Sequence, residues 1–317
     1  MTAIHRIAIV GAGYMGGGIA QELAKAGVAC VLLDAVEGRA EARRAEVVET
    51  VDSYVSKGFL SEAEADRIRT NLSASEDTAG TIASADLVFE VVFEEIGLKH
   101  EVLRMIESHA RPEAIIATNT SAIPIGDLAA VLERPERFLG VHWFNPAPLL
   151  PGVEVIAHET TDKSILPGVV ALLEAAGKEP AVVADTPGFV CNRLQFALFR
   201  EAARMVEDGA ASPEEIDTIV RASFGFRLAL YGPFAVADMA GLDVYANSYV
   251  SLERALGDRF TVPPSLKERV DAGDLGIKSG GGYLGLSKEE ATQMVAARDN
   301  AYAQLGKLRR SLAEENA

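Results

Sequence analysis

A histidine and a glutamate stand inside apolar segments near the middle of the chain, where core packing alone does not require titratable groups. His142 follows the apolar run FLGV, and Glu154 is the second residue of the run VEVI. A neutral imidazole can accept the proton of a substrate hydroxyl, and a carboxylate beside it would fix its tautomer and stabilise the imidazolium. A buried carboxylate also needs a partner. The alternative is a core histidine with satisfied hydrogen bonds and a glutamate on an edge strand.

The position of His142 in its run predicts where the imidazole lies in the fold. The apolar segment before it indicates a buried strand, so His142 falls near the carboxyl end of that strand, and Asn145-Pro146 then turns the chain. In open α/β sheets, ligands bind outside the carboxyl ends of the strands. His158 is the main rival as a proton acceptor, but its polar neighbours indicate a solvated loop. The remaining histidines are His5, before the first strand, and His100 and His109, on a helix that we expect to be exposed.

A glycine-rich turn near the N-terminus predicts a dinucleotide-binding site. The segment GAGYMG fits G-x-G-x-x-G between the strand-like run RIAIV and a helical pattern, which makes Gly11, Gly13, Tyr14, Met15 and Gly16 the expected cofactor contacts. Asp34 ends the next strand-like run and would accept hydrogen bonds from the ribose hydroxyls. Because no arginine immediately follows Asp34, we expect NAD rather than NADP. The alternative is an ordinary strand–turn–helix with a polar strand end.

The order of apolar and amphipathic segments predicts an α/β fold followed by a helical domain. Strand-like runs alternate with helical patterns up to DTPGFVCNRL, residues 185–194, which indicates a Rossmann-like, doubly wound parallel sheet. Beyond this point the pattern is helical. We therefore expect an NAD-binding domain over residues 1–186 and an all-helical substrate and dimerisation domain over residues 187–317.

A helical hairpin is expected to interrupt the sheet pattern. The stretch over residues 36–71 is helical, breaks at Lys57-Gly58, and restarts after a cap signal at Ser61. This insertion is a candidate arm over a ligand. In the second domain, Ser212 before Pro213 marks the start of another helix.

Composition excludes several classes of function. No run of eighteen apolar residues occurs and the N-terminus lacks the features of a signal peptide, so we expect no membrane span. A formal charge of −16 argues against a nucleic-acid partner, because polyphosphates require a basic surface. Cys30 and Cys191 have apolar neighbours and are expected to fill core space in a reducing cytoplasm. We expect a small-molecule substrate and no metal.

Six segments together resemble one family. These are GAGYMGGGIA, ADLVFEVVFEE, ATNTSAIPI, GVHWFNPAPLLPGVEVI, DTPGFVCNRL and GLDVY, which in this order are similar to the short-chain L-3-hydroxyacyl-CoA dehydrogenases over nearly the whole chain. The resemblance implies a Rossmann-like domain, a helical C-terminal domain, NAD as cofactor, a homodimer, and fatty-acid β-oxidation as the metabolic setting.

The resemblance also implies roles for particular residues. His142 matches the catalytic base, Glu154 its orienting carboxylate, Ser121 a serine that binds the substrate oxygen beside the nicotinamide, and Asn192 an asparagine that holds the substrate carbonyl. The matched cofactor contacts are Glu94, Lys99, Ser121, Asn145 and Lys278. Ser121 could instead end a strand, Asn192 could cap a helix, and Lys278 could be an ordinary solvated lysine.

Two regions leave the substrate open. Lys57 and Thr50 on the hairpin match positions that contact CoA, yet the same hairpin is acidic. The segment GFRLALYGPF, residues 225–234, is longer than in CoA-acting members and resembles dehydrogenases of free hydroxy acids, such as L-gulonate, carnitine and pyridoxine-degradation enzymes. There Arg227 could bind a substrate carboxylate or form a salt bridge within the second domain. Trp143, where acyl-CoA enzymes usually have phenylalanine, could narrow the site.

Three functions follow from these residues. The leading hypothesis is NAD-dependent oxidation of an L-3-hydroxyacyl-CoA to the 3-ketoacyl-CoA. The second is oxidation of a free 3-hydroxy carboxylic acid. The third is a protein that binds NAD without catalysis, against which the residues Ser121, His142, Glu154 and Asn192 argue.

Overall fold

The computed structural model describes residues 4–315 and divides into two compact units, Met1–Arg200 and Glu201–Ala317. Helix α8 (Cys191–Glu207) contains the point of division.

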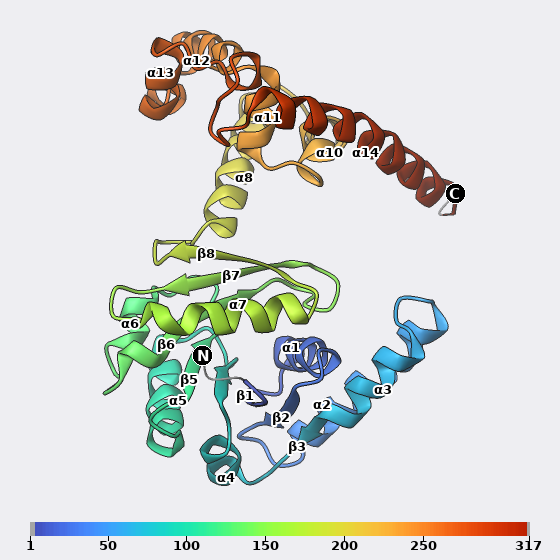
Figure 1. Cartoon of the computed structure of the whole chain (residues 1–317), viewed down its shortest axis with the longest axis vertical. Coiled ribbons are helices and arrows are strands. Elements are labelled where there is room, and N and C mark those ends of the chain that lie inside the picture. Colours follow the sequence, from blue (N-terminus) through green and yellow to red (C-terminus); the bar gives the residue numbers. More distant parts are fainter. Residues whose placement is uncertain (1–3, 316–317) are drawn as a thin grey trace. The chain divides into compact units, whose positions relative to one another are not determined.

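Unit 1 is built on one eight-stranded sheet in the order β3-β2-β1-β4-β5-β6-β7-β8. Its strands, shown in Figure 1, are β1 (Arg6–Val10), β2 (Ala29–Leu33), β3 (Leu72–Ala74), β4 (Leu87–Glu90), β5 (Ile115–Thr118), β6 (Phe138–Trp143), β7 (Gly152–Ala157) and β8 (Glu179–Ala184). The central strands are almost fully buried, because helices cover both faces of the sheet. This architecture confirms the predicted Rossmann-like sheet. The short strand β3 was not predicted, since only three residues carry it.

The direction of the last two strands corrects the expectation of a fully parallel sheet. Strands β3, β2, β1, β4, β5 and β6 are parallel, whereas β7 pairs with β6 in the antiparallel sense and β8 is parallel to β7. The eight residues between β6 and β7 are too few for the crossover that a parallel pair requires. The chain therefore turns back, and β6 and β7 form a hairpin.

Two apolar clusters, one on each face of the sheet, hold the helices in place. One cluster joins the sheet to the helices α1 (Tyr14–Lys25), α2 (Arg39–Ser56), α3 (Glu62–Asn71) and α7 (Leu166–Ala175). The other joins it to α4 (Thr78–Ala83), α5 (Ile96–His109) and α6 (Ile125–Ala129). The short 3₁₀ helices η1 (Pro135–Arg137) and η2 (Lys163–Ile165) precede β6 and α7. Helices on both faces confirm the doubly wound arrangement.

Helices α2 and α3 form the predicted hairpin, drawn in blue in Figure 1. Helix α2 ends at Ser56 with Lys57 as its C-cap, and Gly58 follows with a φ of +73°, a conformation that glycine adopts without steric cost. The Ser61 side chain accepts a hydrogen bond from the N–H of Glu64, and the Glu64 side chain accepts one from the Ser61 N–H. This capping box starts α3, as its sequence indicated.

Unit 2 is helical throughout its described part. After α8 come α9 (Pro213–Ala222), α10 (Phe224–Leu228), α11 (Pro233–Ala240), α12 (Leu242–Leu256), η3 (Asp258–Phe260), α13 (Pro264–Asp271), η4 (Gly276–Lys278) and α14 (Lys288–Glu315). Ser212 caps α9 in a capping box with Glu215, as predicted. Ala237, Leu242 and Leu266 form its small buried core. Within residues 4–315, no helix is long and apolar enough to cross a membrane.

Candidate active site

The β6–β7 hairpin brings the predicted histidine and glutamate together. His142 and Glu154 are directly opposite each other in the register of this antiparallel pair, so their side chains project from the same face. The Nδ1 atom of His142 lies 2.8 Å from Oε2 of Glu154. His142 is 4% exposed and Glu154 is 5% exposed. A hydrogen bond of this length between shielded groups fixes the ring and leaves the other nitrogen to point away from the carboxylate.

The second carboxylate oxygen of Glu154 is also occupied. Oε1 accepts hydrogen bonds from the backbone N–H groups of Val190 and Cys191, at 2.9 and 2.8 Å, where α8 begins. Burial opposes ionisation of this carboxyl, but the hydrogen bonds from His142 and from these two N–H groups outweigh it and hold the pKa of Glu154 below its ordinary value. Glu154 is therefore a fixed anion.

The imidazole of His142 keeps one nitrogen unengaged. Within residues 4–315, Nε2 makes no hydrogen bond, whereas Nδ1 is bonded to Glu154. The rings of Phe144 and Phe189 flank it, with centroids 4.8 and 5.8 Å from that of the imidazole. Phe189 has a φ of +47°, an unusual conformation for a residue other than glycine. A nitrogen with a fixed tautomer and an open acceptor position suits proton transfer.

A loop beyond β5 places Ser121 near the start of α8. Oε1 of Glu94 accepts hydrogen bonds from the Thr120 hydroxyl and from the backbone N–H groups of Ser121 and Ala122, at 2.6 to 3.0 Å. Asn192 donates from Nδ2 to the carbonyl oxygen of Ser121, at 2.7 Å. Asn192 thus holds the Ser121 backbone rather than only capping a helix.

The carboxyl of Glu94 is ionised in this setting. Burial opposes its charge, but the Thr120 hydroxyl, the Lys99 ammonium and the two backbone N–H groups together lower the pKa of Glu94. The anion can therefore keep three N–H and O–H groups of the loop in place.

A buried network beneath this loop was missed by the sequence reasoning. Lys99 lies 2.8 Å from Oε1 of Glu90, a fully buried carboxylate at the end of β4, and 3.4 Å from Oε2 of Glu94. Glu90 also accepts a hydrogen bond from the Thr118 hydroxyl at 2.6 Å. The signal was present, because Glu90 interrupts the apolar run DLVFEVV. Lys99, predicted as a cofactor contact, is 1% exposed and supports Glu94 from below.

The glycine-rich turn has the shape that a dinucleotide requires. Gly11 has a φ of +113°, and a side chain there would collide with the Val91 carbonyl. A side chain at Gly16 would collide with the Gly11 carbonyl, so the helix α1 can approach β1 only with glycine. A Cβ atom on Gly13 would meet nothing within 4 Å, which leaves the turn open on that side. No side chain caps α1, so the N–H groups of its first turn, at Tyr14 and Met15, are available to phosphates.

Asp34 follows β2 and faces the same turn. Its Oδ2 accepts a hydrogen bond from the Ala12 N–H at 2.9 Å, and its Oδ1 accepts one from the Val36 N–H at 3.0 Å. The tertiary structure also brings Arg39 near, with Nε 3.9 Å from Oδ2 of Asp34. The prediction of NAD, which rests on the absence of an arginine immediately after Asp34, does not include Arg39, five residues further on.

The other predicted binding residues lie on or next to α2, in the loop after β6 and in unit 2. Thr50 and Lys57 are exposed on and just after α2, and the Thr50 hydroxyl donates to the Glu46 carbonyl at 2.9 Å. Asn145 is exposed in the loop after β6. In unit 2, Arg227 on α10 forms no ion pair with any described residue, so the predicted salt bridge within the second domain is not found.

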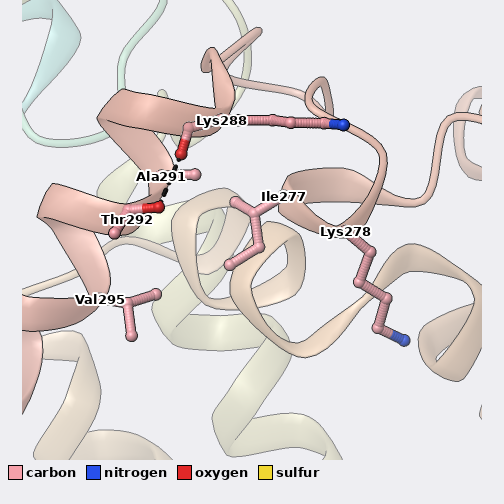
Figure 2. A pocket seen from close by; sticks show the side chains of 6 residues that line it. All are labelled: Ile277, Lys278, Lys288, Ala291, Thr292 and Val295. Carbon is pink, nitrogen blue, oxygen red and sulfur yellow. Dashed lines mark hydrogen bonds between the residues drawn. The ribbon is translucent and has the colours of Figure 1, made fainter.

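Lys278 lies in η4 of unit 2. Its ammonium is 2.8 Å from Oδ1 of Asp243 and lowers the pKa of that carboxyl. Figure 2 shows Lys278 at the end of a shallow groove between η4 and α14. The groove is lined by Ile277, Lys278, Lys288, Ala291, Thr292 and Val295. Lys278 thus has a carboxylate partner, and its role as a cofactor contact stays a prediction.

The fold and the geometry together define a class of protein. A Rossmann-like sheet carries an open glycine-rich turn at the end of β1, a carboxylate at the end of β2, and a histidine with an unengaged nitrogen near the end of β6. All three strands are parallel, so their carboxyl ends share one edge of the sheet. This arrangement is that of a dinucleotide-dependent dehydrogenase.

Comparison with known proteins defines the family. Residues 6–186 match the family described as 3-hydroxyacyl-CoA dehydrogenase, NAD binding domain, and residues 188–285 match the C-terminal domain of the same family. The chain belongs to the 3-hydroxyacyl-CoA dehydrogenase family, whose members are NAD-dependent oxidoreductases.

Two curated relatives and one solved structure show the range of similarity. A 5-formyl-3-hydroxy-2-methylpyridine 4-carboxylate 5-dehydrogenase of Mesorhizobium japonicum is 38% identical over 298 residues, which cover 93% of this chain and 95% of that protein. A probable 3-hydroxybutyryl-CoA dehydrogenase of Bacillus subtilis is 36% identical over 281 residues, which cover 88% and 96%. The crystal structure of a 3-hydroxyacyl-CoA dehydrogenase from Archaeoglobus fulgidus has a TM-score of 0.80 and 31% identity, and covers 98% of this chain and 99% of that one.

Proposed function

We propose that the protein oxidises an L-3-hydroxyacyl-CoA to the 3-ketoacyl-CoA with NAD, and that His142 is the general base. The observation that carries this proposal is the hydrogen bonding of the His142 imidazole, which uses only one of its two nitrogens within residues 4–315. Glu154 engages Nδ1 at 2.8 Å, and Nε2 has no partner within residues 4–315. A histidine held only for structure would have both nitrogens satisfied in so buried a position.

The proposed reaction moves one proton and one hydride away from a carbinol. Nε2 of His142 accepts the hydroxyl proton as the carbon–oxygen double bond forms. A bound NAD would supply the acceptor for the hydride of that carbon. Glu154 stabilises the imidazolium that results, because it is already ionised and within hydrogen-bond distance. In the reverse direction the same imidazolium returns the proton to the ketone oxygen.

Ser121 and Asn192 are proposed to position the reacting oxygen. The Ser121 hydroxyl makes no hydrogen bond within residues 4–315, while its backbone is fixed by Glu94 and by Asn192. A free hydroxyl on a fixed backbone can donate to an oxygen without determining its protonation state. Asn192 orients Ser121 through one N–H of its side-chain amide, and the second N–H of that amide can donate to the substrate carbonyl.

The cofactor contacts are proposed for residues around the glycine-rich turn and the Ser121 loop. The turn would hold the pyrophosphate and Asp34 the adenosine ribose. The residues proposed to complete the site are Glu94, Lys99, Asn145 and Lys278. Of these, Lys99 would act through Glu94, because its ammonium is buried.

The test of this function follows NADH absorbance with acetoacetyl-CoA as the ketone substrate. We expect turnover by the wild type and a loss of turnover in His142→Gln, with NADH binding unchanged when measured by fluorescence. Wild-type protein that binds NADH but reduces neither acetoacetyl-CoA nor a broad panel of keto acids would support a non-catalytic NAD-binding role instead.

A second candidate, oxidation of a free 3-hydroxy carboxylic acid, is favoured by Arg227. This guanidinium has no ion-pair partner among the described residues, and arginine suits bidentate binding of a carboxylate. The hairpin, by contrast, offers CoA the exposed Lys57 among several exposed carboxylates, including Glu49 and Asp52. One relative at 38% identity is named for a pyridine carboxylate substrate.

The two substrates separate in one experiment. With NAD as cofactor, gulonate, carnitine and 3-hydroxybutyrate are compared with 3-hydroxybutyryl-CoA. Arg227→Ala should raise KM for a free acid and leave KM for the thioester unchanged, whereas Lys57→Ala should do the reverse. Turnover of the thioester alone, with KM sensitive only to Lys57, rules out the second candidate.

We also propose a homodimer located in the cytoplasm. Unit 2 leaves many large apolar side chains exposed, such as those of Ile219, Phe234, Val244 and Val250, and association would bury them. Multi-angle light scattering gives the mass in solution. A monomer at micromolar concentration would contradict the dimer.

A further inference from the structure

Two arginines on α2 lie beside the glycine-rich turn. Arg39 is the first residue of α2, and Arg43 follows one helical turn later, so both project from the same side of the helix. Nε of Arg43 donates to the carbonyl oxygen of Ala12 at 3.3 Å, and its aliphatic stem lies over Gly17. Nε of Arg39 lies 3.9 Å from Oδ2 of Asp34. The position proposed for the adenosine ribose is thus bordered by two positive charges as well as by one carboxylate.

The carboxylate of Asp34 is the group that meets the ribose. Its two oxygens accept the N–H groups of Ala12 and Val36, which fixes the plane of the carboxylate and uses two of its four lone-pair positions. The other two positions can accept hydrogen bonds from ribose hydroxyls. A phosphate on the 2′-oxygen would place its negative charge against the same carboxylate, so an ionised Asp34 excludes it.

We propose that Arg39 and Arg43 form a latent site for the 2′-phosphate of NADP, and that Asp34 alone keeps this site closed. The inference rests on the proposed placement of the adenosine ribose at Asp34. Arginine forks match phosphate geometry. The Arg39 side chain is 46% exposed, and its one ion-pair contact among the described residues is the long one to Asp34. Selectivity for NAD is then set by a single negative charge rather than by an absence of positive ones.

The carboxylates near Arg39 and Arg43 do not prevent the two arginines from binding a 2′-phosphate. Arg43 is paired with Glu46 at 2.6 Å, but the Glu46 side chain is 60% exposed, and such a surface pair is weak enough to be exchanged for a phosphate. Glu76 accepts a hydrogen bond from the Gly38 N–H at 3.1 Å, so one of its oxygens is already engaged by backbone. Glu37 is exposed before α2.

The experiment measures dinucleotide binding directly, without a substrate. NADH and NADPH are titrated by fluorescence into the full chain and into the variants Asp34→Ser, Asp34→Ser/Arg39→Ala and Asp34→Ser/Arg43→Ala. The matched control is Asp34→Ser/Arg44→Ala, because Arg44 is on the same helix but is paired with Glu41 and the Leu72 carbonyl. Titration with 2′,5′-ADP against ADP isolates the 2′-phosphate. Asp34→Asn repeats the test if the serine variant does not fold.

We expect the wild type to bind NADH and to discriminate strongly against NADPH. Removal of the Asp34 charge should tighten NADPH binding by about tenfold or more, and loss of either arginine should reverse that gain. The Arg44 control should retain it. Equal NADPH affinity with and without Arg39 and Arg43 would overturn the inference, as would failure of Asp34→Ser and Asp34→Asn to gain NADPH affinity. If the wild type binds no NADH, the proposed cofactor placement fails as well; if it binds NADH normally, only the latent site is at issue.

Discussion

Unit 1 contains two buried pairs in which a carboxylate contacts a side-chain nitrogen, Glu90–Lys99 and Glu154–His142. The two pairs differ in whether the nitrogen-bearing side chain still has an atom without a hydrogen-bond partner. Glu90 and Lys99 meet at 2.8 Å, and the Lys99 ammonium also reaches the Val92 carbonyl and Glu94. Glu154 and His142 also meet at 2.8 Å, but Nε2 of the imidazole keeps no partner within residues 4–315.

The difference teaches that burial and pairing do not by themselves mark a catalytic group. The Lys99 ammonium donates to Glu90 and to the Val92 carbonyl, lies within ion-pair distance of Glu94 and is almost fully buried, so this pair serves to hold Glu94 and the Ser121 loop. The His142 pair is satisfied on one side only. A buried titratable group with one engaged and one open position is the better candidate for chemistry.

The largest effect is expected from His142→Gln. This change removes the proposed base and should lower kcat by about 10²- to 10⁴-fold, because that is the usual contribution of a general base. Unfolding in urea should change little by comparison, and NADH affinity should be retained. His158→Gln, in the polar loop after β7, is the matched control and should keep full activity. Activity lost in the control and kept in His142→Gln would reassign the base.

The second-largest effect is expected on stability, from a change in the Glu90–Lys99 pair. Glu90→Gln leaves the Lys99 charge without its closest partner and should lower the free energy of unfolding by about 3–5 kcal/mol, as for other broken buried pairs. Urea denaturation measures it, and Glu101→Gln on the exposed side of α5 is the control. The pH dependence of kcat should keep its shape, because the His142 pair is untouched. A stability equal to that of the control would show that Glu90 is not part of the support.

A smaller loss of activity is expected from Glu154→Gln. The glutamine keeps the shape but cannot stabilise the imidazolium as a carboxylate does, so kcat should fall roughly a hundredfold, with KM nearly unchanged. Undiminished kcat in Glu154→Gln would mean that Glu154 does not act on the base.

The smallest effect is expected on the pH dependence of the free energy of unfolding, to which Glu154 contributes. Its pKa is lower in the folded protein than its ordinary value, so the stabilisation is present above the unfolded pKa and is lost as the pH falls through the folded pKa. Denaturation of wild type and Glu154→Gln across acidic pH should therefore show a stability gap that narrows on acidification. A gap that widens instead would contradict the direction of the shift.

Local signals made most elements predictable. The glycine-rich turn, the two capping boxes at Ser61 and Ser212, and the break at Lys57-Gly58 are each determined by a few neighbouring residues. His142 and Glu154 could be singled out because each interrupts an apolar run. The division of the chain after residue 186 and the roles of the site residues stay predictions.

Other features were not predicted. The hydrophobic pattern of a buried strand is the same in either direction, so it does not show that β7 is antiparallel; the available signal was the short connection to β6, which is too short for a parallel crossover. Glu90 and Lys99 are nine residues apart on a strand and a helix, and only the packing of α5 on β4 shows that they meet.

The sequence by itself determined the kinds of side chain that this protein can use and the local conformations that carry them, because turns, caps and periodicity depend on near neighbours. Tertiary structure alone decided which groups face each other. It sets the register that places His142 opposite Glu154, and it brings Arg39 to Asp34. The physical reason is that hydrogen bonds and ion pairs act over a few ångströms, whereas the residues that make them here are brought within that distance only when the sheet and its helices assemble.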